Sequence, residues 1–128
     1  KSIGDCAFAE CRNLSEIIIP DSVTGIGNSA FQNCESLTEI NIPNSVISIE
    51  NSVFSGCKNL TKIELPESVT KIGRGVFNNC RNLICMNIPE GITSIESSTF
   101  NGCTSLREIK LSNSVTSIED GAFGCVQI

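Results

Sequence analysis

Phenylalanine recurs at a fixed interval of 23 residues along this chain. The positions are Phe8, Phe31, Phe54, Phe77, Phe100 and Phe123. Cysteine and leucine keep the same interval, at Cys11, Cys34, Cys57, Cys80, Cys103, Leu14, Leu37, Leu60, Leu83 and Leu106. A constant period of this length is the signature of a solenoid, in which each repeat forms one coil and stacks on its neighbours.

The repeat runs through nearly all of the 128 residues, and no linker or change of composition interrupts it. Hydrophobic residues make up 40% of the chain, which is enough for one continuous core. We therefore predict a single repeat domain over residues 1–128, built from about five coils. Because the sequence opens in mid-repeat at Lys1-Ser2-Ile3, we expect it to be part of a longer protein.

The charge of the chain disfavours nucleic acid as a partner. The net charge is −5, the pI is about 4.6, and lysine and arginine form no basic run, so a phosphate backbone would be repelled. No apolar segment approaches the roughly 20 residues that a helix needs to cross a bilayer, and we predict no membrane insertion. No signal peptide is recognisable. Histidine, the commonest general base, is absent, and so are tryptophan and tyrosine, the usual aromatic anchors of binding hot spots.

The coil over residues 26–49 shows the pattern that the repeats share. Apolar residues are spaced by three and four over residues 26–34, as in a short helical or 3-10 turn. Apolar and polar residues then alternate over residues 37–42, which predicts a half-buried strand that Pro43 ends. Residues 46–49 leave room for a second short strand. A repeat of 23 residues is too short for two helices and their loop, so we predict a mainly β solenoid of the α/β class, with one strand per coil in a parallel sheet and the turns on the opposite side.

Strand residues that alternate with the buried ones form the open face of the predicted sheet. They vary from coil to coil while the core positions do not, as a recognition surface on a constant scaffold requires. An unselected surface varies in the same way, so the pattern leaves both interpretations open. The candidate partner-binding residues are Glu16, Ile18, Glu39, Asn41, Lys62, Glu64, Cys85, Asn87, Glu108 and Lys110.

The cysteines favour a core role over a disulfide framework. Eight cysteines in a short chain ordinarily suggest disulfides, but five of them keep the phase of the repeat and therefore share one structural position. Small apolar thiols suit a buried ladder, and we predict that they are mostly reduced. Cys6, Cys85 and Cys125 lie off this phase. A free surface thiol and a local disulfide, Cys6 with Cys11 or Cys80 with Cys85, both remain open for them.

Catalytic and metal-binding chemistry receive little support from the sequence. Thiols one coil apart spread out instead of converging on one ion, and there is no CxxC motif, so we predict no metal and no cofactor. Carboxylates such as Glu39 and Glu64 could hydrolyse a glycoside as a pair, but Lys62 shares their surface and nothing predicts a deep pocket. We therefore predict a non-enzymatic protein. Sequons at Asn13 and Asn59 occupy the same phase of the repeat and leave glycosylation open.

The motif L-x-x-I-x-[IL]-P-x-x-[VI] is similar to a leucine-rich repeat, and A-F-x-x-C-x-x-L before it resembles one subclass. That subclass is the BspA-like (Treponema-type) leucine-rich repeat family of bacterial and protozoan surface proteins. The resemblance covers almost the whole chain and implies a right-handed solenoid. In the common pattern, the turn after the strand holds Asn or Cys, whose side chain satisfies backbone groups. Here that position is held by Ser22, Ser45, Ser68, Gly91 and Ser114.

The resemblance also implies a cell-surface or secreted setting and adhesion to proteins of a host or of neighbouring cells. We accordingly predict a protein-protein interaction module that docks a protein or peptide on its sheet face. The alternative is a structural spacer that presents another domain of a longer chain. Neither end shows a polar cap, so the end coils are expected to expose apolar rows and unpaired strand edges. This predicts end-to-end self-association.

Overall fold

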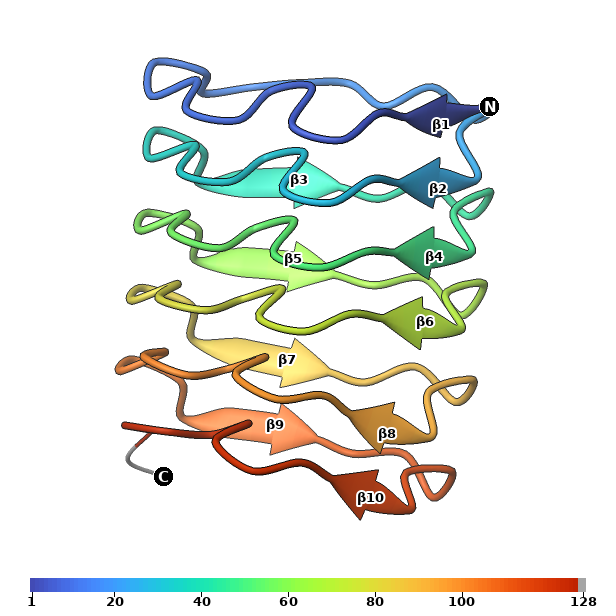
Figure 1. Ribbon diagram of the computed structural model, residues 1–128, viewed down its shortest axis with the longest axis vertical. Helices are drawn as coiled ribbons and strands as arrows, with labels where there is room; N and C mark the ends of the chain where they lie inside the picture. The colour runs from blue at the N-terminus through green and yellow to red at the C-terminus, as the bar shows by residue number, and fades with distance from the viewer. Residues whose placement is uncertain (127–128) are drawn as a thin grey trace.

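In the computed structural model the chain is a stack of coils, each lying on the one before it (Figure 1). The structure describes residues 1–126. Regular structure within this range consists of short strands, and no helix is present there. Paired strands of successive coils run parallel and are one repeat apart, so that Ile40 lies opposite Ile63. The predicted solenoid with parallel strands is confirmed.

The three-residue strands form the sheet that the alternating pattern predicts. They are β3 (Glu39–Asn41), β5 (Lys62–Glu64), β7 (Cys85–Asn87) and β9 (Glu108–Lys110). The middle residue of each is buried or half-buried and the outer two are exposed, because successive side chains of a strand alternate between its faces. β3 pairs with β5 and β7 with β9. The spacing between β5 and β7 is visibly wider (Figure 1), and the Ile84 amide bridges this level to the Thr61 carbonyl at 3.3 Å.

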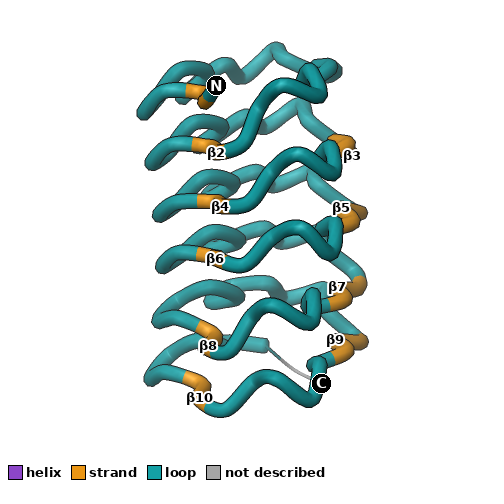
Figure 2. The backbone as a smooth tube through the Cα atoms, turned by 90° about the vertical axis from the view of Figure 1, so that its right-hand side faces the viewer, coloured by secondary structure: helices purple, strands orange, loops and turns teal. Residues whose placement is uncertain are grey.

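A second row of two-residue strands lies on the other side of the stack, as Figure 2 shows. They are β1 (Ser2–Ile3), β2 (Gly25–Ile26), β4 (Ser48–Ile49), β6 (Lys71–Ile72), β8 (Ser94–Ile95) and β10 (Ser117–Ile118). The second short strand is thus confirmed. The prediction of a long strand in every coil is wrong for the first coil, where residues 16–18 form no strand. Those residues have a neighbouring coil on one side only.

The predicted helical turn over residues 26–34 is also wrong, because the backbone amides there alternate between two kinds of acceptor. The Ala30 amide bonds to the carbonyl three residues earlier at 3.2 Å, whereas the Ser29 and Phe31 amides bond to carbonyls of the next coil at 2.8 and 3.0 Å. Ser29 has a φ of 58°, which interrupts a right-handed helix. The segment is therefore a series of turns that is hydrogen-bonded to its neighbour in the stack.

The phenylalanines form one column through the core. Successive ring centroids are 5.3 to 5.8 Å apart and the rings are within 12° of parallel. The four inner rings are fully buried, while Phe8 and Phe123 are half-buried because each has a stacked ring on one side only. Met86, which stands where the other long strands have isoleucine, is buried as well. The periodic positions thus build one continuous core.

Coils at the two ends leave part of this core uncovered. Ile118 is 50% exposed at one end, and Phe8 is half-buried at the other. The expected exposure of apolar residues at the ends is therefore present. Ser112 takes the place of the proline that follows the other long strands, but it does not lengthen β9. Its hydroxyl instead donates to the Pro89 carbonyl at 3.3 Å.

Candidate recognition surface

The long strands place all ten predicted site residues on one side of the stack, with their side chains exposed. Each strand supplies two of them, separated by one buried residue, as the period-two alternation requires. The strands lie directly one below the other (Figure 1), so the outward residues form two columns along the stack. The first column is Glu16, Glu39, Lys62, Cys85 and Glu108, and the second is Ile18, Asn41, Glu64, Asn87 and Lys110.

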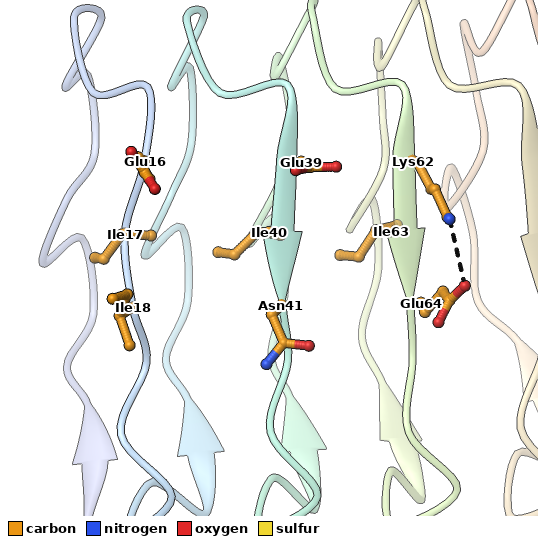
Figure 3. A pocket seen from close by; sticks show the side chains of 9 residues that line it. All are labelled: Glu16, Ile17, Ile18, Glu39, Ile40, Asn41, Lys62, Ile63 and Glu64. Carbon is orange, nitrogen blue, oxygen red and sulfur yellow. Dashed lines mark ion pairs between the residues drawn. The ribbon is translucent and has the colours of Figure 1, made fainter.

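A hollow of about 380 Å³ lies over the first three coils of this face. Glu16, Glu39 and Glu64 surround it, and Figure 3 shows their side chains standing on the outer side of the strands. Lys62 lies 3.6 Å from Glu64, and both side chains are more than half exposed. Ile18 is 87% exposed, the largest value among the exposed large apolar side chains. The hollow therefore combines acidic groups with an unpacked apolar side chain.

The charge changes along the face. Over the first three coils the outward residues carry three carboxylates and one ammonium group. The fourth coil contributes the uncharged Cys85 and Asn87, and the fifth combines Glu108 with Lys110. Arg107 is exposed beside this last pair and adds a second cation. A mixed charge pattern of this kind gives specificity for a complementary partner more than it gives affinity.

The cysteine ladder is structural in the coils that are covered on both sides. Cys34, Cys57, Cys80 and Cys103 are fully buried and free. Each thiol donates to a phenylalanine carbonyl of the preceding coil, at 3.1 or 3.2 Å. Burial raises the pKa of Cys34 to about 11 and that of Cys57 and Cys103 to about 12. These thiols are thus protonated and unreactive at neutral pH.

The remaining cysteines lie outside the core. Cys6, Cys85 and Cys125 are exposed and free, and so is Cys11, which belongs to the end coil. The free surface thiol is therefore the alternative that the structure shows. Cys85 has a distinct position, because it lies in the middle of the sheet face.

A charged column on the turn side was not predicted as a unit. The Arg12 guanidinium lies 2.9 Å from Glu35, and the Lys58 ammonium lies 3.1 Å from the same carboxylate. Hydrogen bonds from both cations lower the pKa of Glu35. The signal was present in the sequence, because the three residues are 23 apart, but the search for function concentrated on the strands. Exposed pairs of this kind stabilise a fold by at most about 1 kcal/mol each.

The serine position after the strand behaves as predicted in part. The Ser68 hydroxyl donates to the Val46 carbonyl at 2.7 Å, and the Ser114 hydroxyl donates to the Ile92 carbonyl at 2.8 Å. The Ser45 hydroxyl is buried without a hydrogen-bond partner. Gly91 offers no hydroxyl to its loop. Equivalent positions thus differ in how well they satisfy the backbone.

Within residues 1–126, no three Cys, Asp or Glu side chains come together in a way that could hold a metal ion. The same range contains no helix that is long and apolar enough to cross a membrane. The Asn59 side chain of one sequon donates to the Glu35 carbonyl at 2.7 Å and is exposed. Glycosylation there stays a prediction.

Comparison with known proteins agrees with the repeat geometry. The family model described as BspA type leucine-rich repeat region, with six copies, matches residues 25–128. The chain belongs to this family. The fixed period of 23 residues, the one-repeat register of the strands and the stacked phenylalanines are the structural form of that membership. No curated protein matches the chain significantly.

Several solved structures of bacterial leucine-rich repeat proteins are similar to the chain. A leucine-rich repeat protein of T. pallidum is 36% identical with a TM-score of 0.85, and the match covers 88% of this chain and 53% of that one. A leucine-rich cell surface protein of Faecalibacterium prausnitzii is 38% identical with a TM-score of 0.86, covering 96% and 34%. A leucine-rich repeat protein of Eubacterium ventriosum is 35% identical with a TM-score of 0.88, covering 98% and 34%. The chain thus spans between a third and about half of these proteins.

Leucine-rich repeats of this kind are in general non-enzymatic interaction modules whose stacked coils present an extended binding surface. In this chain the scaffold positions are constant, and the outward strand positions carry the variation. Family membership therefore gives the class of function, while the identity of the binding face must be argued from the residues that lie on it.

Proposed function

We propose that this chain is a protein-binding module whose sheet face, formed by the ten outward strand residues, docks a protein or an extended peptide. The observation that carries the proposal is the exposed Ile18 beside the hollow that Glu16 and Glu39 line. A solvent-exposed isoleucine surrounded by charged groups is typical of a binding surface, because burying it in a partner is favourable.

The size of the face supports a short segment as the docked element. From the first coil to the fifth the face extends about 19 Å, at about 4.8 Å per coil. An extended peptide of about six residues spans that length at about 3.3 Å per residue. Its favoured composition is a basic group over the first three coils, where carboxylates predominate, and an acidic group near Arg107 and Lys110.

We further propose that the module belongs to a cell-surface or secreted adhesin-like protein of greater length, with residues 1–128 forming one repeat domain of it. The support is that a similar solved structure is that of a cell surface protein, and that the chain covers only 34% of it. The partner would then be a protein on a host or neighbouring cell.

A capture experiment tests the binding face. The double variant Glu39→Lys/Lys62→Glu reverses two charges on the face and leaves the net charge unchanged. A matched control, Glu50→Lys/Lys71→Glu, exchanges an ion pair of 2.6 Å that lies off the proposed face. We expect a surface-protein fraction of neighbouring cells to yield a partner for the natural chain and for the control, but not for the face variant. Equal capture by all three would refute the sheet face as the site.

The spacer alternative has one observation in its favour, the half-exposed Ile118 at an end coil. End coils with uncovered apolar residues and unpaired strand edges favour stacking of one chain on the next. Such a head-to-tail contact does not close, so the weight-average mass would rise continuously with concentration. Sedimentation equilibrium of the chain and of Ile118→Lys distinguishes this behaviour. A mass that stays constant, or that Ile118→Lys leaves unchanged, would count against the alternative.

A further inference from the structure

The two outward columns of the sheet face carry opposite charges in a regular order. Lys62 precedes Glu64 in β5, and Glu108 precedes Lys110 in β9. In β3, Glu39 and Asn41 form an acceptor and donor pair. Neighbouring positions in one column are about 4.8 Å apart, and the columns are about 7 Å apart. Each strand thus presents two different and mutually complementary groups.

This order makes the face complementary to itself in one orientation. If two faces meet about a two-fold axis parallel to the stack, every coil lies opposite the same coil and the strand direction is reversed. The first column of one copy then meets the second column of the other. Lys62 lies opposite Glu64 of the second copy, and Glu108 lies opposite Lys110.

The other two-fold arrangement brings like charges together. An axis parallel to the strands places the first coil opposite the fifth and keeps each column opposite itself. Lys62 would then meet Lys62, Glu64 would meet Glu64, and Glu16 would meet Glu108. Like charges across an interface are costly, so this orientation is disfavoured. The sequence order therefore selects one of the two symmetric packings.

We propose that two copies of this chain associate face to face through the ten outward strand residues, about a two-fold axis parallel to the stack. By symmetry each contact occurs twice, which gives four pairs of opposite charge and two Glu39–Asn41 pairs. Exposed Ile18 lies against the methylene groups of Glu16 of the second copy. The inference rests on the proposed function, since it names a partner for the same face.

The association is weak and sensitive to salt. A face about 19 Å long is smaller than the roughly 800 Å² per partner that stable interfaces bury, so we expect a dissociation constant above about 10 µM. The ion pairs lie at the surface, where counterions screen them, and raising the salt from 0.05 to 1 M should weaken the dimer. The dimer also occupies the face on which another protein would dock, so the two partners compete.

Charge exchange within β5 provides the test. Sedimentation velocity at concentrations from about 0.05 to 1 mM measures the monomer–dimer equilibrium. Lys62→Glu alone places two carboxylates opposite each other at both symmetric contacts, and Glu64→Lys alone does the same with two ammonium groups. We expect each single variant to weaken the dimer about tenfold or more, and the double variant Lys62→Glu/Glu64→Lys to restore it. Thermal unfolding of each variant confirms that the fold is retained.

The results separate this inference from the proposed function. A natural chain that stays monomeric at 1 mM, or a double variant that is not restored, would overturn the dimer. Mass that rises beyond the dimer and is unaffected by Lys62→Glu would assign association to the ends of the stack and would also overturn it. Capture of a surface protein by a monomeric chain would leave the proposed function intact. A restored double variant that captures no such protein would support the dimer alone.

Discussion

Removing the Phe54 ring gives the most quantitative test of the stacked core. Phe54 is fully buried, with Phe31 at 5.6 Å on one side and Phe77 at 5.8 Å on the other. Phe54→Ala deletes the ring and leaves a cavity in the middle of the column. Substitutions of this kind cost about 3–5 kcal/mol, and the loss of two stacked neighbours places this site toward the upper end. Phe8→Ala should cost about half as much, because Phe8 is half-buried and has one stacked ring at 5.3 Å.

The measurement is urea unfolding followed by far-ultraviolet circular dichroism, with Phe54→Leu as a control that keeps most of the apolar volume. We expect the order Phe54→Ala, Phe8→Ala, Phe54→Leu from the largest to the smallest loss of unfolding free energy. Equal losses at Phe54 and Phe8 would contradict the column, because the two sites would then have equivalent surroundings. An unchanged midpoint for Phe54→Ala would contradict a packed core at this position.

Three further predictions concern hydrogen bonds and charge. Ser68→Ala should cost about 1 kcal/mol in urea unfolding because it removes the bond to the Val46 carbonyl, whereas Ser45→Ala should cost nothing, since the Ser45 hydroxyl has no partner; equal losses would contradict the difference. Gly91→Ser should gain about 0.5–1 kcal/mol by supplying the hydroxyl that the equivalent coils have and by restricting the unfolded chain, and a loss of stability would refute this. Glu96→Gln should raise the melting temperature at pH 7, because the hydrogen bond to the neighbouring carboxyl raises the pKa of Glu96 and its neutral form is the one that the fold favours. The folded state binds this proton more tightly, so the advantage should shrink as the pH falls through the raised pKa, and a constant advantage down to pH 3 would be inconsistent with it.

The architecture was predictable because a period repeated over the whole chain leaves few alternatives. Alternation around Ile40 and Ile63 placed the strands, and their neighbours were then assigned to the correct face. The turn region could not be predicted in the same way. Spacings of three and four fit a helix, but they also fit a chain whose alternate amides bond to the next coil, as at Ser29 and Phe31. Local spacing does not reveal contacts between coils.

The site was predictable as a set of exposed positions and not as a set of contacts. Sequence alternation located Glu39 and Lys62 on the open face, and both are exposed. The absence of a strand at residues 16–18, and with it the high exposure of Ile18, depends on the missing neighbour of the first coil. The charged column of Arg12 and Glu35 was missed because side chains on turns carry no alternation to mark them.

The most direct test of the binding face uses the natural thiol at its centre. Cys85 is exposed in the middle of the sheet face, while Cys6 is exposed on the turn side of the first coil. Alkylation by iodoacetamide, followed by mass spectrometry of the peptides, gives the rate at each cysteine with and without the captured partner. The account predicts that saturating partner slows alkylation of Cys85 at least tenfold and leaves Cys6 unchanged. Unchanged labelling of Cys85 under saturating partner would contradict the assignment of the sheet face as the recognition surface.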